Sequence, residues 1–244
     1  AEATNTTDSH SFLTDIVIGY ELGSRLATSL HGTTSDYHTS GAWISIAVAA
    51  IGARRLGLSQ EKTKHALGIA EYHGPRSQMM RCIDHPTMLK DGSGFGAMAG
   101  VSAAYLAENG FSGAPAITMD SDDTISFWKD LGQKWLIKEQ YFKPYPVCRW
   151  AQAPIEAVLN LKFKHNISSK DVKNIEIHTF HEAIRLAISE PKTTEEAQYS
   201  TSYPCAVALV NGDVGVKEVS ENSFRDPETL RISKSLKMME NDYC

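Results

Sequence analysis

Apolar residues recur at helical spacing through the first part of the chain. Positions 16, 22, 26 and 30 predict a helix over residues 15–30. Residues 43–56 are apolar on nearly every side, which predicts a helix buried by several neighbours. Ser59 is the expected N-cap of a third helix. The small residues between 92 and 110 predict a fourth helix that a neighbour can approach closely.

The pattern changes after about residue 135. Residues 135–137 predict a short strand, and the alternation over residues 172–180 predicts a half-buried one. Helices are expected over residues 153–163, over residues 203–211 and from Pro227 onward, with loops over residues 31–40 and 76–92. We therefore expect a mostly α protein, with an all-helical domain over residues 1–138 and a smaller α+β domain over residues 139–244.

Composition narrows the function. The 244 residues carry 24 Lys and Arg against 29 Asp and Glu, with no basic run, so we expect no nucleic-acid partner. The longest apolar stretch, residues 42–53, is too short to span a bilayer, and the given N-terminus has no secretory signal, so no membrane partner is expected. The four cysteines form no CxxC pair, which favours thiols in a reducing compartment. They are Cys82, Cys148, Cys205 and Cys244.

The first segment that could carry chemistry is residues 36–41, a loop just before a buried helix. His38 stands there beside Thr39 and Ser40. An imidazole beside hydroxyl groups at a helix start can act as a general acid or base, and the helix-start amides favour anions. The alternative is a capped helix with an incidental surface histidine.

The second segment is residues 85–96. Lys90 precedes Gly92, Ser93, Gly94 and Gly96 at a helix start, where an ammonium group and bare amides suit a carboxylate or phosphate. The segment has neither the Walker spacing nor a preceding strand, so it is no P-loop or dinucleotide fingerprint. Alternatively, its glycines serve only close helix packing.

The third segment is residues 141–150, where Lys143 and Arg149 lie among aromatic residues and prolines. Arg149 could hold a carboxylate with two hydrogen bonds, and Lys143 could act as a point charge. The alternative is a packed linker whose cations extend to solvent. No His and carboxylate set with metal-ligand spacing occurs, so no catalytic metal is expected.

Together these segments suit a small polycarboxylate. Cations would bind the carboxylates while a His or Lys removes a proton from the neighbouring carbon. The candidate catalytic residues are His38, Lys90 and Lys143. Arg149, Ser93 and Tyr145 are the candidates for substrate binding.

At these segments the chain resembles the MmgE/PrpD family, whose members include 2-methylcitrate dehydratase, cis-aconitate decarboxylase and iminodisuccinate epimerase. The matching stretches follow the family's order over nearly the whole chain. They are GYELGSRLA (19–27), YHTSGAW (37–43), ARRLGLSQEKTKHALGIAEYHG (53–74), MLKDGSGFGAMAGVSAAYLAENGFSG (88–113), KPYPVCRWAQAPIEA (143–157) and YSTSYPCAVALVNGDVG (199–215).

The resemblance implies a helical domain, an α+β lid and an active site in the cleft between them. It also implies a homodimer without cofactor that acts on small di- or tricarboxylates. His38 matches the family's active-site His, Lys90 the Lys before the glycine-rich helix, and Lys143 the Lys at the lid entrance. We expect a cytoplasmic protein, or a mitochondrial one in a eukaryote.

Three departures qualify the resemblance. The family's N-terminal helical segment with its acidic motif has no counterpart, nor has the return of the chain to the helical domain, and Gln152 stands where many relatives carry His.

The expected activity is a 2-methylcitrate dehydratase-like hydro-lyase. Decarboxylation of cis-aconitate and epimerisation of a dicarboxylate are the enzymatic alternatives. A truncated paralogue that only binds a carboxylate or a full-length partner is the non-enzymatic one.

Overall fold

The computed structural model describes residues 8–241, and it divides the chain into two compact units. Within the described range, the first unit contains residues 8–79 and 91–140, and the second contains residues 80–90 and 141–241. The chain therefore passes from one unit to the other three times. Residues 80–90, which the expected boundary near residue 138 assigned to the helical domain, lie in the second unit. Cys244 lies outside the described residues.

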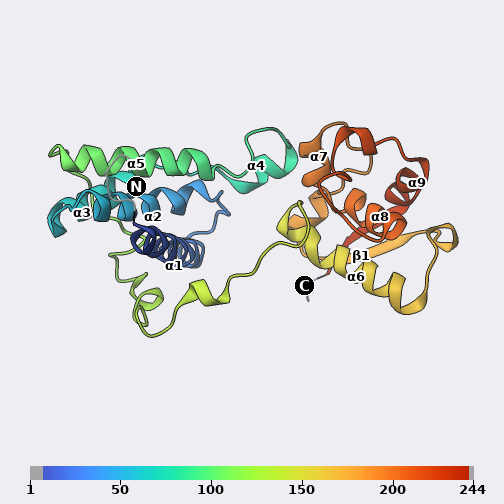
Figure 1. Ribbon diagram of the computed structural model, residues 1–244, viewed down its shortest axis with the longest axis horizontal. Coiled ribbons are helices and arrows are strands. Elements are labelled where there is room, and N and C mark those ends of the chain that lie inside the picture. The colour runs from blue at the N-terminus through green and yellow to red at the C-terminus, as the bar shows by residue number, and fades with distance from the viewer. Residues whose placement is uncertain (1–7, 242–244) are drawn as a thin grey trace. The chain divides into compact units, whose positions relative to one another are not determined.

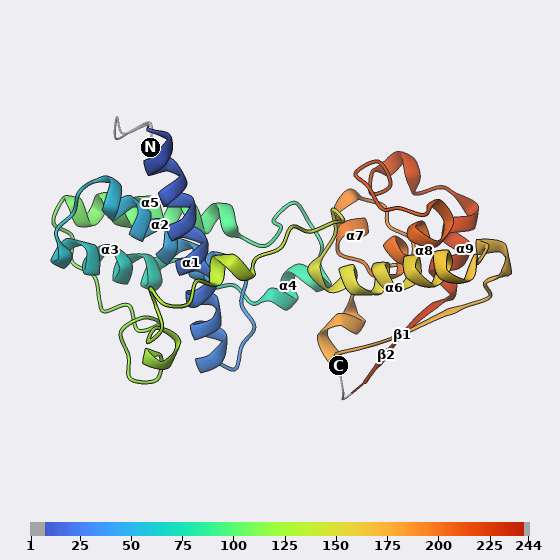
Figure 2. The same cartoon turned by 60° about the horizontal axis from the view of Figure 1, so that its bottom comes forward.

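The first unit is built from four long helices, as its hydrophobic pattern predicted. Helices α2, α3 and α5 pack on one another, and α1 crosses α2 (Figures 1 and 2). Ser59 caps α3 as expected, because its side chain accepts the amide hydrogen of Lys62. The helices are α1 (Ser9–Thr33), α2 (Gly41–Arg55), α3 (Gln60–His73) and α5 (Ser93–Glu108).

Helices α2 and α5 approach so closely at their N-terminal ends that side chains there would collide. A Cβ atom on Gly96 would lie 2.8 Å from the carbonyl oxygen of Gly41 and 2.9 Å from its Cα atom. A Cβ atom on Gly41 would lie 2.7 Å from Cγ of Pro75 and 2.9 Å from the carbonyl oxygen of Gly92. The expectation that the small residues of α5 permit close packing is thus confirmed, and both helices begin at the same place.

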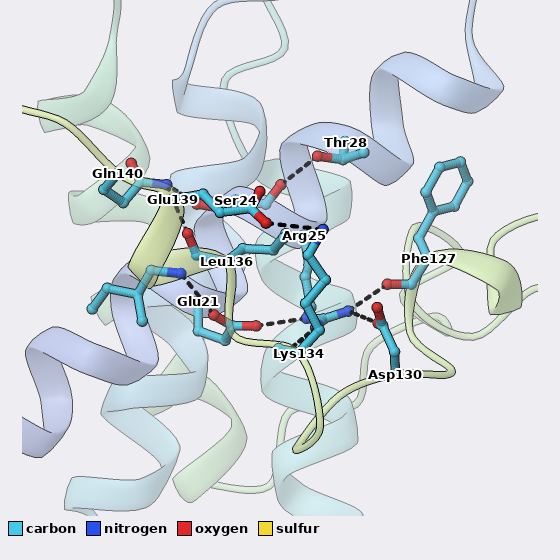
Figure 3. Close-up of polar contacts among 11 residues, drawn as sticks. Glu21, Ser24, Arg25, Thr28, Phe127, Asp130, Lys134, Leu136, Glu139 and Gln140 are labelled. Carbon is cyan, nitrogen blue, oxygen red and sulfur yellow. Dashed lines mark hydrogen bonds and ion pairs between the residues drawn. The ribbon is translucent and has the colours of Figure 1, made fainter.

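A buried arginine joins α1 to the irregular segment after α5 (Figure 3). Arg25 is 2 % exposed and donates to the carboxylates of Glu21 at 2.8 Å and Asp130 at 2.6 Å. Its terminal nitrogens also donate to the carbonyl oxygens of Phe127 and Lys134, each at 2.8 Å. Because every guanidinium nitrogen has a partner, the charge is tolerated in the interior, and it fixes the path of the chain there.

The strand expected over residues 135–137 is wrong. The chain forms instead a 3₁₀ turn, η3 (Leu136–Glu139), after a similar turn, η2 (Ile125–Phe127). The amide hydrogen of Ile137 is donated to Oε2 of Glu21 at 3.0 Å. A side chain of α1 therefore accepts the amide hydrogen that would otherwise pair with a neighbouring strand.

The second unit has its core around α8, whose residues from Ser202 to Leu209 are all buried. Helices α6 and α9 pack on α8, and Gly212 ends α8 in the left-handed conformation.

Asp226 caps α9 by accepting the amide hydrogen of Thr229. The helices are α4 (Met79–Asp84, at the boundary), α6 (Arg149–His165), α7 (Thr194–Gln198), α8 (Ser202–Asn211) and α9 (Pro227–Ser235), with 3₁₀ turns η4 (Ser169–Asp171), η5 (His181–Arg185) and η6 (Glu221–Ser223).

The second unit also contains a parallel pair of strands, β1 (Ile175–Thr179) and β2 (Leu236–Glu240). Ile175 pairs with Leu236 and Thr179 with Glu240. The strand expected over residues 172–180 is confirmed as β1, whereas β2 was not expected. Helix α4 contradicts the loop expected over residues 76–92, and Nε of Arg185 holds Asp84 at its end, 2.8 Å from Oδ1.

We expect Gly96→Ala to lower the free energy of unfolding by about 1–3 kcal/mol, because the new methyl group would meet the backbone of Gly41. Gly94→Ala, an earlier position on α5, is the matched control. A Cβ atom added to Gly94 would meet nothing within 4 Å, so the same substitution should be neutral or stabilising by up to about 1 kcal/mol. Urea denaturation followed by tryptophan fluorescence measures both. Equal effects of the two substitutions would contradict the close approach of the helices.

We expect Arg25→Met to destabilise the first unit by about 3–5 kcal/mol, because it strands the carboxylate of Glu21 in the interior. Lys134→Met is the control. It removes only the exposed ion pair with Glu139, and it should cost less than about 1 kcal/mol. Fluorescence reports mainly on this unit, since Trp43, Trp128 and Trp135 belong to it. Comparable losses from both substitutions would show that Arg25 does not hold the segment.

Candidate functional site

His38 lies in the first unit on the loop of residues 34–40, between α1 and α2. The loop pairs with residues 77–79, because Thr39 donates its amide hydrogen to Ser77 and Met79 donates to Tyr37, each at 2.8 Å. His38 is only 5 % exposed. His38 is therefore not a surface histidine, and its catalytic role stays a prediction.

The contacts and the burial of the His38 ring favour its neutral form. Nε of Arg76 donates to its Nε2 atom at 3.3 Å, and a guanidinium can only donate, so Nε2 carries the lone pair and Nδ1 the proton. The backbone amide of His38 donates to Nε2 of His31, also at 3.3 Å. Burial lowers the pKa of His38 below its usual 6.5, the charge of Arg76 lowers it further, and Asp36 acts in the opposite direction.

Two helix starts meet beside this histidine. The amide of Ser40 donates to Oδ1 of Asp91 at 2.9 Å, and the hydroxyl oxygens of Ser40 and Ser93 are 2.5 Å apart. Neither α2 nor α5 has an acidic residue in its first turn or a side-chain cap. The carboxylate of Asp91 already lies at this junction, however, and accepts one of its amide hydrogens. The role of Ser93 in substrate binding stays a prediction.

Lys90 lies in the second unit, and its ammonium group is partly engaged. Nζ donates to Oε1 of Gln198 and lies 3.9 Å from Oε1 of Glu195. It also lies 5.9 Å from the centre of the Tyr199 ring. The ammonium side chain remains 43 % exposed, so a carboxylate from solution can reach it.

Gln198 links Lys90 to the proline-rich turn of residues 143–148. Its side-chain amide donates to the carbonyl oxygen of Pro146 at 3.1 Å, and its backbone carbonyl accepts the amide hydrogen of Cys148 at 2.8 Å. Lys90 of the second candidate segment is therefore linked to the third segment within the second unit. Sequence reasoning missed Gln198, because nothing in a polar stretch before α8 marks one glutamine as the link.

The proline-rich turn is fixed from inside by Gln152. This side chain is 4 % exposed, accepts the amide hydrogen of Tyr145 at 3.2 Å and donates to the carbonyl oxygens of Tyr145 and Val147 at 3.0 and 3.1 Å. Tyr145 is itself buried and donates to Glu156 at 2.6 Å. Burial, with Glu156 beside it, raises the pKa of Tyr145 to about 12. Tyr145 therefore stays protonated and, in this structure, faces Glu156.

The two cations of the third segment are exposed. Lys143 stands at the start of the turn, and Arg149 is the first residue of α6, with its guanidinium 4.7 Å from the centre of the Tyr141 ring. A stacked guanidinium keeps its edge available for a carboxylate. The roles of both residues stay predictions.

Family models cover most of the chain. The MmgE/PrpD N-terminal domain matches residues 1–128, and the MmgE/PrpD C-terminal domain matches residues 145–243. The chain belongs to the MmgE/PrpD family. The resemblance found in the sequence is thereby confirmed.

Two curated relatives support the assignment to the MmgE/PrpD family. The chain is 24 % identical over 219 residues to a probable 2-methylcitrate dehydratase of Saccharomyces cerevisiae, which covers 82 % of this chain and 42 % of that protein. It is 30 % identical over 115 residues to the cis-aconitate decarboxylase-like protein oryM of Aspergillus oryzae, which covers 42 % of this chain and 21 % of that protein. The matches thus span less than half the length of either relative.

Residues that this MmgE/PrpD chain brings together fall into one group in each unit. The first unit holds His38 with Ser93 nearby through Ser40, and it adds Arg76 and His31, which sequence reasoning missed. The second unit holds Lys90 and the proline-rich turn through Gln198. Among residues 8–241 no group of three or more His, Cys, Asp or Glu side chains is arranged to hold a metal ion. No helix in the described range is long and apolar enough to cross a membrane.

The burial of His38 predicts how the free energy of unfolding of the first unit depends on pH. The pKa of His38 is about 6.5 in the unfolded chain and lower in the folded one, so the unfolded state binds more protons as the pH falls. Above pH 6.5 the titration of His38 therefore costs the folded state no stability. As the pH falls below 6.5, the free energy of unfolding decreases, until the pH reaches the lower pKa of the folded state. The same direction holds for His31, whose pKa is lowered mainly by burial.

We expect His38→Gln to reduce the loss of stability of the first unit between about pH 7.5 and 5.5. The comparison with the wild type is required because hydrogen bonding to Glu240 raises the pKa of His181, which contributes in the opposite direction. Urea denaturation at both pH values measures the difference. An unchanged pH dependence in the variant would show that His38 is not held neutral.

Proposed function

We propose that this protein is a cofactor-independent lyase that acts on a small polycarboxylate, as a 2-methylcitrate dehydratase-like hydro-lyase. The observation that carries the proposal is the state of His38. A buried imidazole whose Nε2 atom accepts a hydrogen bond from Arg76 lies on the loop that leads into the joined starts of α2 and α5. Such a base beside the cation of Arg76 suits removal of a proton from a carbon that bears a carboxylate.

The proposed reaction needs no oxidant or reductant. Nε2 of His38 accepts the proton from the carbon next to a carboxylate, and the electrons of the broken C–H bond form a carbon–carbon double bond. The β-hydroxyl leaves with the electrons of its C–O bond. The imidazolium returns the proton to it, so the products are an unsaturated polycarboxylate and water.

The second unit by itself contains cations that suit the binding of carboxylates. The Nζ atom of Lys90 is held by the neutral amide of Gln198 and lies 3.9 Å from the carboxylate of Glu195, while the side chain stays 43 % exposed. Lys143 and Arg149 are exposed and can bind further carboxylates.

The likeness to the cis-aconitate decarboxylase-like protein supports a second candidate, decarboxylation of an unsaturated tricarboxylate. Epimerisation of a dicarboxylate shares the same first requirement, a base beside a carboxylate. These reactions differ in the group that leaves, so product analysis separates them.

We expect His38→Gln to lower kcat for 2-methylcitrate by at least about 10²-fold, because the proton acceptor is lost. Lys90→Ala should raise KM or abolish turnover, because a carboxylate loses its cation. Lys164→Ala, an exposed lysine on α6, is the matched control and should change neither. The assay follows the absorbance of the new conjugated alkene, with the full-length protein and chromatographic identification of the product.

Circular dichroism spectra of the variants should match the wild type. A His38→Gln variant that keeps its kcat would remove the base from the mechanism. A wild-type protein that binds citrate but transforms none of 2-methylcitrate, citrate and cis-aconitate would favour the non-catalytic, carboxylate-binding alternative.

A further inference from the structure

Arg76 occupies an unusual position for a cation. It is an exposed residue on the segment that pairs with the His38 loop, and its Nε atom donates to the buried Nε2 atom of His38 over 3.3 Å. Arg25 and Arg54 each pair with a carboxylate. Among residues 8–241, however, no carboxylate forms an ion pair with Arg76, and its two terminal nitrogens make no hydrogen bond. The planar edge that suits a carboxylate is therefore available.

The contact between Arg76 and His38 also engages the atom that the proposed reaction needs. While Nε of Arg76 donates to Nε2, the lone pair cannot accept a proton from a substrate. The 3.3 Å distance is at the long end for a hydrogen bond, so the contact is easily exchanged for a stronger one. A hydrogen bond from a guanidinium to a carboxylate is charge-assisted and roughly twice as strong as one to a neutral acceptor.

We propose that Arg76 binds a carboxylate of the substrate, and that this binding moves its Nε atom off His38 and leaves Nε2 free beside the carbon that loses the proton. This inference rests on the proposed function, since it names the residue that recognises the carboxylate at the same base. On this proposal, binding of the substrate frees the Nε2 atom of His38.

The charges around His38 support this exchange. Three ionisable groups face it: His31 from α1, Asp36 from its own loop and Arg76 from the segment after α3. Of these, Arg76 is the permanent cation. A carboxylate paired with Arg76 would cancel that charge and add its own negative field, so the imidazole would become more basic when substrate is bound.

The test measures citrate binding and the titration of His38 separately from turnover. Histidine-labelled full-length protein is titrated by NMR with and without citrate, and the His38 signal is assigned from its absence in His38→Gln. The variants are Arg76→Gln and Arg76→Lys. Arg54→Gln is the matched control, since it removes a cation from the opposite end of α2, roughly 20 Å away along a helix of this length.

We expect citrate to raise the pKa of His38 in the wild type. Arg76→Gln should raise it without citrate and weaken citrate binding about tenfold, the loss of one charge-assisted contact. Arg76→Lys should keep the pKa low in the free protein, because it keeps the charge, but should still bind citrate more weakly, because it loses the planar edge. In Arg76→Lys, an unchanged pKa of His38 together with weaker citrate binding would separate recognition of the carboxylate from support of the loop. Both quantities can be measured in this variant even if Arg76→Gln does not fold.

A citrate dissociation constant that stays within twofold of wild type in both Arg76 variants would overturn the inference. The same would follow if citrate left the pKa of His38 unchanged in the wild type. If Arg76 governs citrate binding but no polycarboxylate is transformed, the proposed function fails while the inference stands. If turnover depends on His38 but not on Arg76, the inference fails while the proposed function stands.

Discussion

The candidate site of the first unit depends on the contact between the N-terminal ends of α2 and α5. Gly41 and Gly96 have no side chains, so the backbones of the two helices touch there. That contact brings Ser40 and Ser93 within hydrogen-bond distance and places Asp91 against the amide of Ser40. The loop that carries His38 ends at this junction. A side chain at either glycine would move the helix starts and the histidine loop together.

Two arginines of the first unit, Arg25 and Arg76, differ in how far their hydrogen-bond donors are satisfied. Arg25 is surrounded by two carboxylates and two carbonyl oxygens, so its charge is satisfied and its purpose is structural. Arg76 faces a neutral imidazole and retains unused donors. Arg25 belongs to the stretch GYELGSRLA, which the sequence resemblance singled out, yet its contacts explain that stretch by folding alone. A complete set of partners explains Arg25 by folding alone, whereas the unused donors of Arg76 beside a base are the observation from which its binding of a carboxylate is proposed.

Much of the fold could be predicted because its signals are local. Helical spacing predicted α1, the apolar run of residues 43–56 predicted α2, and Ser59 predicted the start of α3. The side chains of Ser59 and Asp226 cap the helices that follow them. The errors arose where a distant residue decides the local structure. Glu21 takes the amide of Ile137 and prevents a strand, and β2 forms because β1, about sixty positions earlier, offers it a partner. Local pattern contains neither fact.

The residues of the candidate site could be named from the sequence, but their contacts could not. His38 and Lys90 were selected because their residue types at helix starts suit proton transfer and anion binding, and these roles stay predictions. Arg76 and Gln198 escaped notice because each acts on a residue far away in the chain, 38 and 108 positions respectively. The burial of His38 was also unforeseen, because a loop of Thr, Ser and Asp favours exposure, while here its backbone pairs with the segment after α3.

The backbone at Lys90 provides a separate argument that its side chain matters. Lys90 has φ of +52°, a conformation that costs most side chains about 1 kcal/mol or more and that glycine adopts freely. Asn166 also has a positive φ, but it ends α6, where asparagine is a common choice. No comparable preference explains a lysine. The ammonium group of this strained lysine contacts the amide of Gln198, lies near the carboxylate of Glu195 and stays partly open to solvent, so its binding of a ligand stays a prediction.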